Sequence, residues 1–97
     1  MDFEVSKNEF LRQFETKIDG KLIKLEFSEQ EKNIFLTRFE IHNSLEEGTY
    51  KDDFIKAVLD NLAEEDKKVI PSCPAVTAYF RKNRALYKHL LPAGINL

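Results

Sequence analysis

The spacing of the hydrophobic residues changes at Gly48, and this change limits the folds open to the chain. Before Gly48, apolar and polar residues alternate, which is typical of strands with one buried face. After Gly48, apolar residues recur every three or four positions, which is typical of an amphipathic helix. A chain of 97 residues has room for one domain, so both patterns must share one core. We therefore expect a single α+β domain over residues 1–97.

Three alternating stretches precede the change, at residues 10–18, 21–27 and 34–41. Asp19-Gly20 separates the first two stretches and predicts a tight hairpin, because both residues tolerate a positive φ. The face of the second stretch that would be buried carries Ile23, Leu25 and Phe27. A polar turn at residues 28–33 leads to the third stretch. Connections this short predict an antiparallel meander of three strands.

An amphipathic helix is expected over about residues 49–65. Its apolar stripe consists of Tyr50, Phe54, Val58 and Leu62. Thr49 and Asp52 have the spacing of a capping pair at its start. Residues 68–70 form a short apolar strand, and Pro74 suits the first position of a second helix. The expected order of elements is β-β-β-α-β-α.

The charges are unevenly placed around a net charge of −2. Residues 44–66 hold eight acidic and two basic residues, whereas residues 74–97 hold four basic residues and no acidic one. Four cations without interleaved aromatic rings are too few for a nucleic-acid surface. No apolar run is long enough to span a membrane, and the N-terminus is too charged for a signal peptide. The single cysteine gives no disulfide framework, so we expect a cytoplasmic protein without nucleic-acid or membrane partners.

Two motifs resemble those of a known family. The first is Lys68-Val69-Ile70-Pro71-Ser72-Cys73-Pro74, followed by an aromatic-rich helix and by Arg84-Ala85-Leu86-Tyr87. The second is the hairpin Asp19-Gly20-Lys21 with Leu25 and Phe27. Over residues 19–91 the chain therefore resembles the small Yjdj-type proteins of the GNAT (general-control-related N-acetyltransferase) family. The resemblance implies a GNAT-like fold, acetyl-CoA as the cofactor, and acetyl transfer to an amine whose identity the residues do not specify.

The resemblance also implies an acetyl-CoA site after the third strand. The family pattern RGxG holds a pyrophosphate at a helix N-terminus and aligns here with Glu46-Glu47-Gly48-Thr49. The implied cofactor-binding residues are Ile41, Glu47, Gly48, Thr49, Tyr50 and Lys51. Two unit charges about 6 Å apart interact by roughly 0.7 kcal/mol in water and about 3 kcal/mol at an effective dielectric of 20. We therefore expect Glu46 and Glu47 to weaken the binding that the backbone N–H groups still allow.

Cys73 and His42 are the candidate catalytic residues. Cys73 precedes Pro74 and would lie at a helix N-terminus, where the resemblance makes it a nucleophile or a proton acceptor. The alternative is a small buried cysteine that fills the core. His42 could act as a general base toward an amine, or it could be a surface residue in a turn. The family's strand histidine aligns with Arg38, which stays protonated and cannot act as a base.

Two functions remain open at this point. The chain could be an acetyl-CoA-dependent N-acetyltransferase, as the resemblance implies. It could instead be a non-catalytic binding or interaction protein that keeps the GNAT fold, which the acidic loop and the missing strand histidine favour. No spacing of His, Cys, Asp and Glu suggests a metal site, so none is expected.

Overall fold

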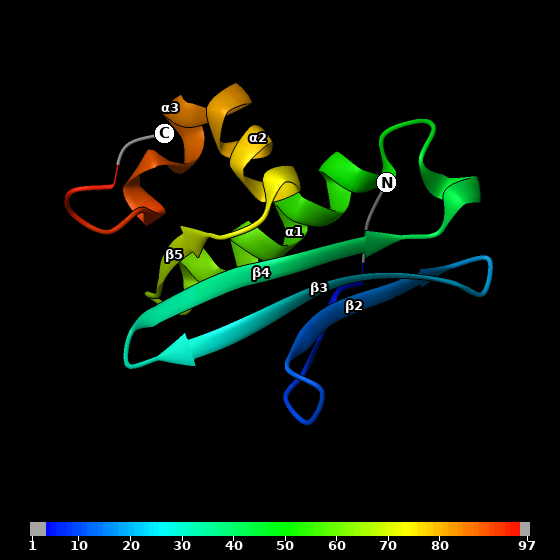
Figure 1. Cartoon of the computed structure of the whole chain (residues 1–97), viewed down its shortest axis with the longest axis horizontal. Coiled ribbons are helices and arrows are strands. Elements are labelled where there is room, and N and C mark those ends of the chain that lie inside the picture. Colours follow the sequence, from blue (N-terminus) through cyan, green and yellow to red (C-terminus); the bar gives the residue numbers. More distant parts are fainter. Residues whose placement is uncertain (1–3, 96–97) are drawn as a thin grey trace.

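A five-stranded sheet with the strand order β1-β2-β3-β4-β5 forms the centre of the computed structural model, which describes residues 4–95 (Figure 1). The strands are β1 (Ser6–Asn8), β2 (Gln13–Ile18), β3 (Lys21–Gln30), β4 (Asn33–Ile41) and β5 (Lys68–Pro71). The helices are α1 (Tyr50–Glu64), α2 (Pro74–Lys82) and α3 (Arg84–Tyr87), with 3-10 turns η1 (Asn43–Leu45) and η2 (Lys88–Leu90). In Figure 1, α1 crosses behind β4, and α2 and α3 lie above β5 and β4 in the view. The predicted α+β class and β-β-β-α-β-α order are confirmed, with β1 added at the N-terminal side.

Residues with positive φ angles form the two central turns of the meander. Asp19 (φ 52°) and Gly20 (φ 77°) form the predicted hairpin turn between β2 and β3. Gln30 pairs with Asn33, so only residues 31 and 32 separate β3 from β4. The polar stretch 28–30 was predicted as part of a turn and instead extends β3. It remains a strand because one face of an antiparallel sheet can be exposed to solvent.

The first strand of the meander starts later than predicted. β2 begins at Gln13, and Phe10 and Leu11 are 92% and 55% exposed in the turn before it. Arg12 has a φ of 53°, a left-handed conformation that interrupts an extended chain. The strand predicted from residue 10 was therefore wrong at its start. Before this turn, β1 pairs antiparallel with β2; three residues are too short to give a periodic signal in the sequence.

A β-bulge at Thr37 interrupts the pairing of β3 with β4. On one side of the bulge Phe27 lies opposite Leu36, and on the other side Glu26 lies opposite Arg38. Thr37 is thus the extra residue of β4, and its hydroxyl donates to the carbonyl oxygen of Glu26 over 3.3 Å. An extra residue reverses the side-chain alternation of the strand that contains it.

The bulge keeps apolar side chains of β4 on one face of the sheet along its whole length. Phe39 and Ile41 lie opposite Leu25 and Ile23, and side chains directly opposite each other share a face. Without the bulge, strict alternation would place Arg38 and Glu40 on that face. The apolar face therefore runs from β2 to β5 and is covered by the helices.

The helix α1 covers the apolar face as predicted. Its buried residues are Phe54, Ile55, Val58, Leu59 and Leu62. The predicted capping pair was wrong in its partner, because the hydroxyl of Thr49 donates to the carboxylate of Asp53 over 2.9 Å rather than pairing with Asp52. The carboxylate of Asp52 instead accepts from Lys82 over 3.3 Å. Within residues 4–95, no helix is both long and apolar enough to cross a membrane.

Two tyrosines attach α2 and α3 to α1. The Tyr87 hydroxyl donates to the carboxylate of Asp60 over 3.0 Å, and the rings of Tyr79 and Tyr87 are 5.8 Å apart. Burial raises the pKa of both tyrosines. The helices that follow β5 are therefore fixed to α1 by a buried pair of rings with a polar end.

Lys7 ties the edge strand β1 to the rest of the sheet. Its side chain lies on the apolar face, opposite Phe14, with its Nζ atom 5.3 Å from the centre of the Phe27 ring. The same Nζ atom lies 2.9 Å from the carboxylate of Glu29, which also accepts a 2.7 Å hydrogen bond from Lys67. The Glu29 carboxylate on β3 therefore binds both Lys7 of the edge strand β1 and Lys67 of the segment between α1 and β5.

Candidate functional site

The strands β4 and β5 separate beyond Leu36 and form a fork. Their parallel pairing runs from Asn33 opposite Lys68 to Leu36 opposite Pro71. The N–H of Ser72 then donates to the carbonyl oxygen of Leu36 over 2.9 Å. β4 continues to Ile41, and no strand formed by residues 4–95 lies beside this second half on that edge.

The free half of β4 directs backbone groups into the fork. The N–H of Phe27 donates to Arg12 on the β2 side, so alternate residues of β3, including Leu25 and Ile23, also bond toward β2. Their partners on β4, Phe39 and Ile41, therefore direct their N–H and C=O groups away from β3. Such an edge can pair with an extended ligand that carries amide groups.

A hollow of about 610 Å³ lies beside this free edge. It is lined by Phe39, Glu40, Ile41, Glu46 and Lys51. The Phe39 ring packs 6.1 Å from the Phe54 ring, which fixes the apolar wall of the hollow. The Glu40 carboxylate is neutralised by Arg38 at 2.6 Å and Lys24 at 3.5 Å. The opposite charges of Glu46 and Lys51 therefore dominate the hollow.

Of the residues predicted to bind the cofactor, Ile41 and Lys51 line this hollow. Glu47, Gly48 and Thr49 are exposed in the loop before α1, and Tyr50 is half-buried against the core. Gly48 has a φ of 91°, which favours glycine at the turn into the helix. The contributions of Phe39 and Glu40 to the lining were missed; for Phe39 the reason is the bulge, which places its side chain on the apolar face and has no signal in the sequence.

Cys73 lies at the base of the fork, directly after Ser72. It is the N-cap residue of α2, with Pro74 at the first helical position, as predicted. Its side chain is 7% exposed and packs in the hydrophobic core. Its carbonyl oxygen accepts from the N–H of Thr77 over 3.1 Å. Cys73 is not among the described residues that line the hollow.

His42 caps the 3-10 turn that follows β4. Its Nδ1 atom accepts from the N–H of Ser44 over 3.1 Å, and the side chain is exposed. No hydrogen bond within residues 4–95 joins His42 to Cys73. The His42 side chain is thus exposed in a turn, whereas the Cys73 side chain is buried in the core.

Arg38 lies on the face of the sheet opposite the helices. Its guanidinium is 68% exposed in its side chain and contacts Glu40 and Glu26. It thus belongs to a row of surface ion pairs and does not face the fork. Within the part of the chain that the structure describes, no group of three or more His, Cys, Asp or Glu residues could hold a metal ion.

An antiparallel meander that leads through α1 to a parallel fifth strand, with a fork where β4 and β5 separate, defines an α+β protein of the GNAT-like class. Residues 13–90 match the family described as GCN5-related N-acetyl-transferase, and the chain belongs to this family. No curated protein matches the chain. The matched segment includes β2 to η2 and leaves out β1.

Proposed function

We propose that this protein is a small Yjdj-type N-acetyltransferase that transfers an acetyl group from acetyl-CoA to an amine. The observation that carries the proposal is the free half of β4, which borders a hollow beside the start of α1. Membership of the N-acetyl-transferase family supports it. Fold alone would not be sufficient, because one fold can serve many activities.

The free edge of β4 fits the pantetheine arm of the cofactor. That arm is extended and contains two amides, which can pair with a strand edge through N–H and C=O groups. Phe39 and Ile41 supply these groups, and their half-buried side chains offer apolar contact. The fit requires no rearrangement of the sheet at this edge.

The residues near the start of α1 fit the phosphate groups less well. The N-terminus of α1 favours an anion through the positive end of the helix dipole, and Lys51, in the first turn of α1, offers a cation in the hollow. Glu46 lines the same hollow and opposes an anion there. The expected result is binding that is weaker than a loop without carboxylates would give, by a factor of tens or more.

Bound acetyl-CoA would supply a thioester, whose C–S bond breaks as the amine nitrogen forms a C–N bond and the amine proton passes to sulfur. Cys73 is the proposed catalytic residue, as a proton acceptor or as a nucleophile, because it lies at the base of the fork and at the N-terminus of α2. His42, exposed beside the end of β4, is the proposed base for an incoming amine. The role of Cys73 requires its thiol, which is 7% exposed, to become accessible when the ligand binds.

Thermal unfolding with and without acetyl-CoA tests the proposal. At a ligand concentration of about 100 times Kd, binding stabilises the folded state by about 2.7 kcal/mol. For a domain of this size the melting temperature should rise by more than about 10 °C. Release of free CoA in the presence of a mixture of primary amines should follow, and Cys73→Ala should abolish it while leaving the melting shift in place.

The alternative function is a binding protein that keeps the fold without acetyl transfer. Glu46 in the hollow and the buried side chain of Cys73 favour it. No melting shift at millimolar acetyl-CoA and no release of CoA from the folded protein would establish this alternative.

A further inference from the structure

Glu15 differs from the other glutamates of the sheet in having no ion-pair partner within residues 4–95, although Lys17 and Lys24 act on its charge at longer range. Glu26, Glu29 and Glu40 each have a lysine or arginine nitrogen within 4.0 Å. Lys24 lies opposite Glu15 on β3, but its Nζ atom is 3.5 Å from both Glu26 and Glu40. Within residues 4–95, Glu15 makes no ion pair, so its charge is available to a ligand.

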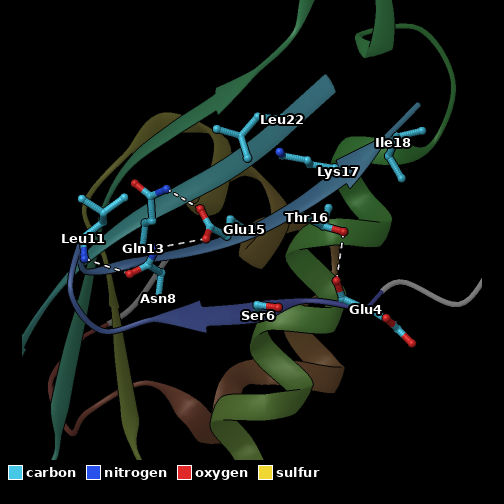
Figure 2. Close-up of a pocket in the computed structure, with 10 residues that line it drawn as sticks. All are labelled: Glu4, Ser6, Asn8, Leu11, Gln13, Glu15, Thr16, Lys17, Ile18 and Leu22. Atoms are coloured by element: carbon cyan, nitrogen blue, oxygen red, sulfur yellow. Dashed lines mark hydrogen bonds between the residues drawn. The ribbon is translucent and has the colours of Figure 1, made fainter. Parts of the chain in front are cut away.

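Two amide groups hold the Glu15 carboxylate in place (Figure 2). Asn8 donates to one of its oxygens over 3.0 Å, and Gln13 donates to the other over 2.6 Å. Gln13 is 6% exposed, and the side-chain oxygen of Asn8 accepts from the N–H of Leu11 over 3.0 Å, so both donors are themselves fixed. These hydrogen bonds, chiefly the one from Gln13, lower the pKa of Glu15. A carboxylate accepts about four hydrogen bonds, so capacity remains for a ligand.

The carboxylate borders a hollow of about 710 Å³ on the face of the sheet turned away from α1 (Figure 2). Its apolar lining includes Leu11 and Leu22, which are 55% and 38% exposed. Lys17 is the one cationic residue among the described residues of the lining. The part contributed by β1 lies outside the segment that matches the family, which begins at residue 13.

We propose that this hollow binds a primary alkylammonium group, which pairs with Glu15 while its alkyl chain contacts Leu11 and Leu22. An oriented carboxylate that makes no ion pair within residues 4–95, beside exposed apolar side chains, matches the charged end and the apolar stem of such a ligand. The group can come from a small amine or from a lysine side chain of a polypeptide. The described residues that line this site include none of those that line the hollow beside β4, so its binding can be measured separately from acetyl-CoA binding.

Amide NMR titration of the full chain with butylammonium chloride tests the proposal. Saturable shifts are expected for Asn8, Gln13, Glu15 and Leu22, and titration with butanol or sodium butyrate should not reproduce them. Glu15→Gln keeps the shape and removes the charge, and it should weaken binding by about fivefold or more, as expected for a hydrogen bond to a charged group. The matched control is Glu9→Gln, which removes the same charge from the adjacent turn, outside the hollow, and should leave binding unchanged.

Lys17→Gln provides a test with the opposite sign. It removes the cation that competes for the same carboxylate, so butylammonium should bind about twofold to threefold more tightly. This variant also keeps the test decisive if Glu15→Gln alters the fold. A comparison of butylammonium with N-acetyl-lysine methylamide distinguishes the two sources, since tighter binding of the second indicates a lysine side chain. Shifts that do not saturate, or that are the same in Glu15→Gln and wild type, would overturn the proposal.

Discussion

The N–H of Ser72 donates to the carbonyl oxygen of Leu36 over 2.9 Å, and this bond sets the base of the fork. In a parallel pair, every second residue of β5 directs its N–H toward β4. Ser72 does so, and the next residue of the same parity is Pro74, which has no N–H. Pro71 also lacks an N–H, but a residue at this position would direct its N–H away from β4, so no bond to β4 is lost. The two prolines therefore allow pairing up to Ser72 and end it there.

Charge repair of the loop before α1 should strengthen acetyl-CoA binding. Glu46→Arg with Glu47→Gly replaces two repulsive charges by one attractive charge, and affinity should rise at least about tenfold at low salt. The gain should shrink at high salt, because both positions are exposed. Calorimetry measures the affinity for acetyl-CoA at low and at high salt. Glu64→Arg with Asp66→Gly makes the same change of net charge at the far end of α1 and should have little effect; an equal gain there would rule out a local cause.

Truncation of Val58 should destabilise the fold. Val58 is fully buried between α1 and the sheet, so Val58→Ala removes two methyl groups from a packed core. The free energy of unfolding should fall by about 1–3 kcal/mol, as measured by denaturant titration. Asn61→Ala, at an exposed position of the same helix, serves as the control and should change it by less than about 0.5 kcal/mol. Equal midpoints for Val58→Ala and wild type would contradict the assigned buried face of α1.

Neutralising Glu29 should remove a stabilising effect that depends on pH. Hydrogen bonds from Lys67 and Lys7 lower the pKa of Glu29 from its ordinary value of 4.5. A carboxyl group with a lowered pKa stabilises the folded state above its unfolded-state value, and this stabilisation is lost as the pH falls through the folded-state value. Glu29→Gln should therefore cost about 1 kcal/mol at neutral pH and progressively less below about pH 4.5. Urea titrations of the wild type and of Glu29→Gln between pH 7 and pH 3 measure the difference in their free energies of unfolding. A difference that does not change with pH would contradict the prediction.

Tyr87→Phe should reduce the loss of stability at alkaline pH. Burial raises the pKa of Tyr87 above its ordinary value of 10.0, so the folded state keeps the proton more tightly than the unfolded chain. The resulting stabilisation is complete below pH 10 and is lost as the pH rises above it. The variant loses the 3.0 Å hydrogen bond to Asp60, which should cost about 0.5–1.5 kcal/mol at neutral pH. Above pH 10 the melting temperature of the variant should therefore fall less steeply with pH than that of the wild type. Equal slopes for the two proteins would contradict a raised pKa of Tyr87.

Elements with a strong local signal could be predicted from the sequence. Asp19-Gly20 forms the expected turn, and the four-residue spacing from Tyr50 to Leu62 correctly predicted α1. The position of Cys73 at the N-cap of α2 followed from Pro74. In each case a few adjacent residues determine the backbone conformation.

Features that depend on contacts between distant segments could not be predicted. The β-bulge at Thr37 can be recognised only from the pairing register of β4 with β3. It determines which side chains of β4 line the hollow beside that strand. Likewise, β1 is a strand only because β2 offers it an edge. The hollow beside Glu15 depends on that pairing, so nothing in the order of residues alone indicated it.

The placement of Lys7 has a consequence for how copies of this protein meet. β1 is an outer strand of the sheet, and an uncovered outer strand can join the same strand of another molecule and so begin a growing fibril. A second sheet added there would have to bury the Lys7 ammonium, which now sits between two phenylalanine rings and a carboxylate. The same side chain that holds β1 to its own molecule therefore makes β1 a poor template for a neighbouring molecule, so we expect aggregation through the β1 edge to be suppressed.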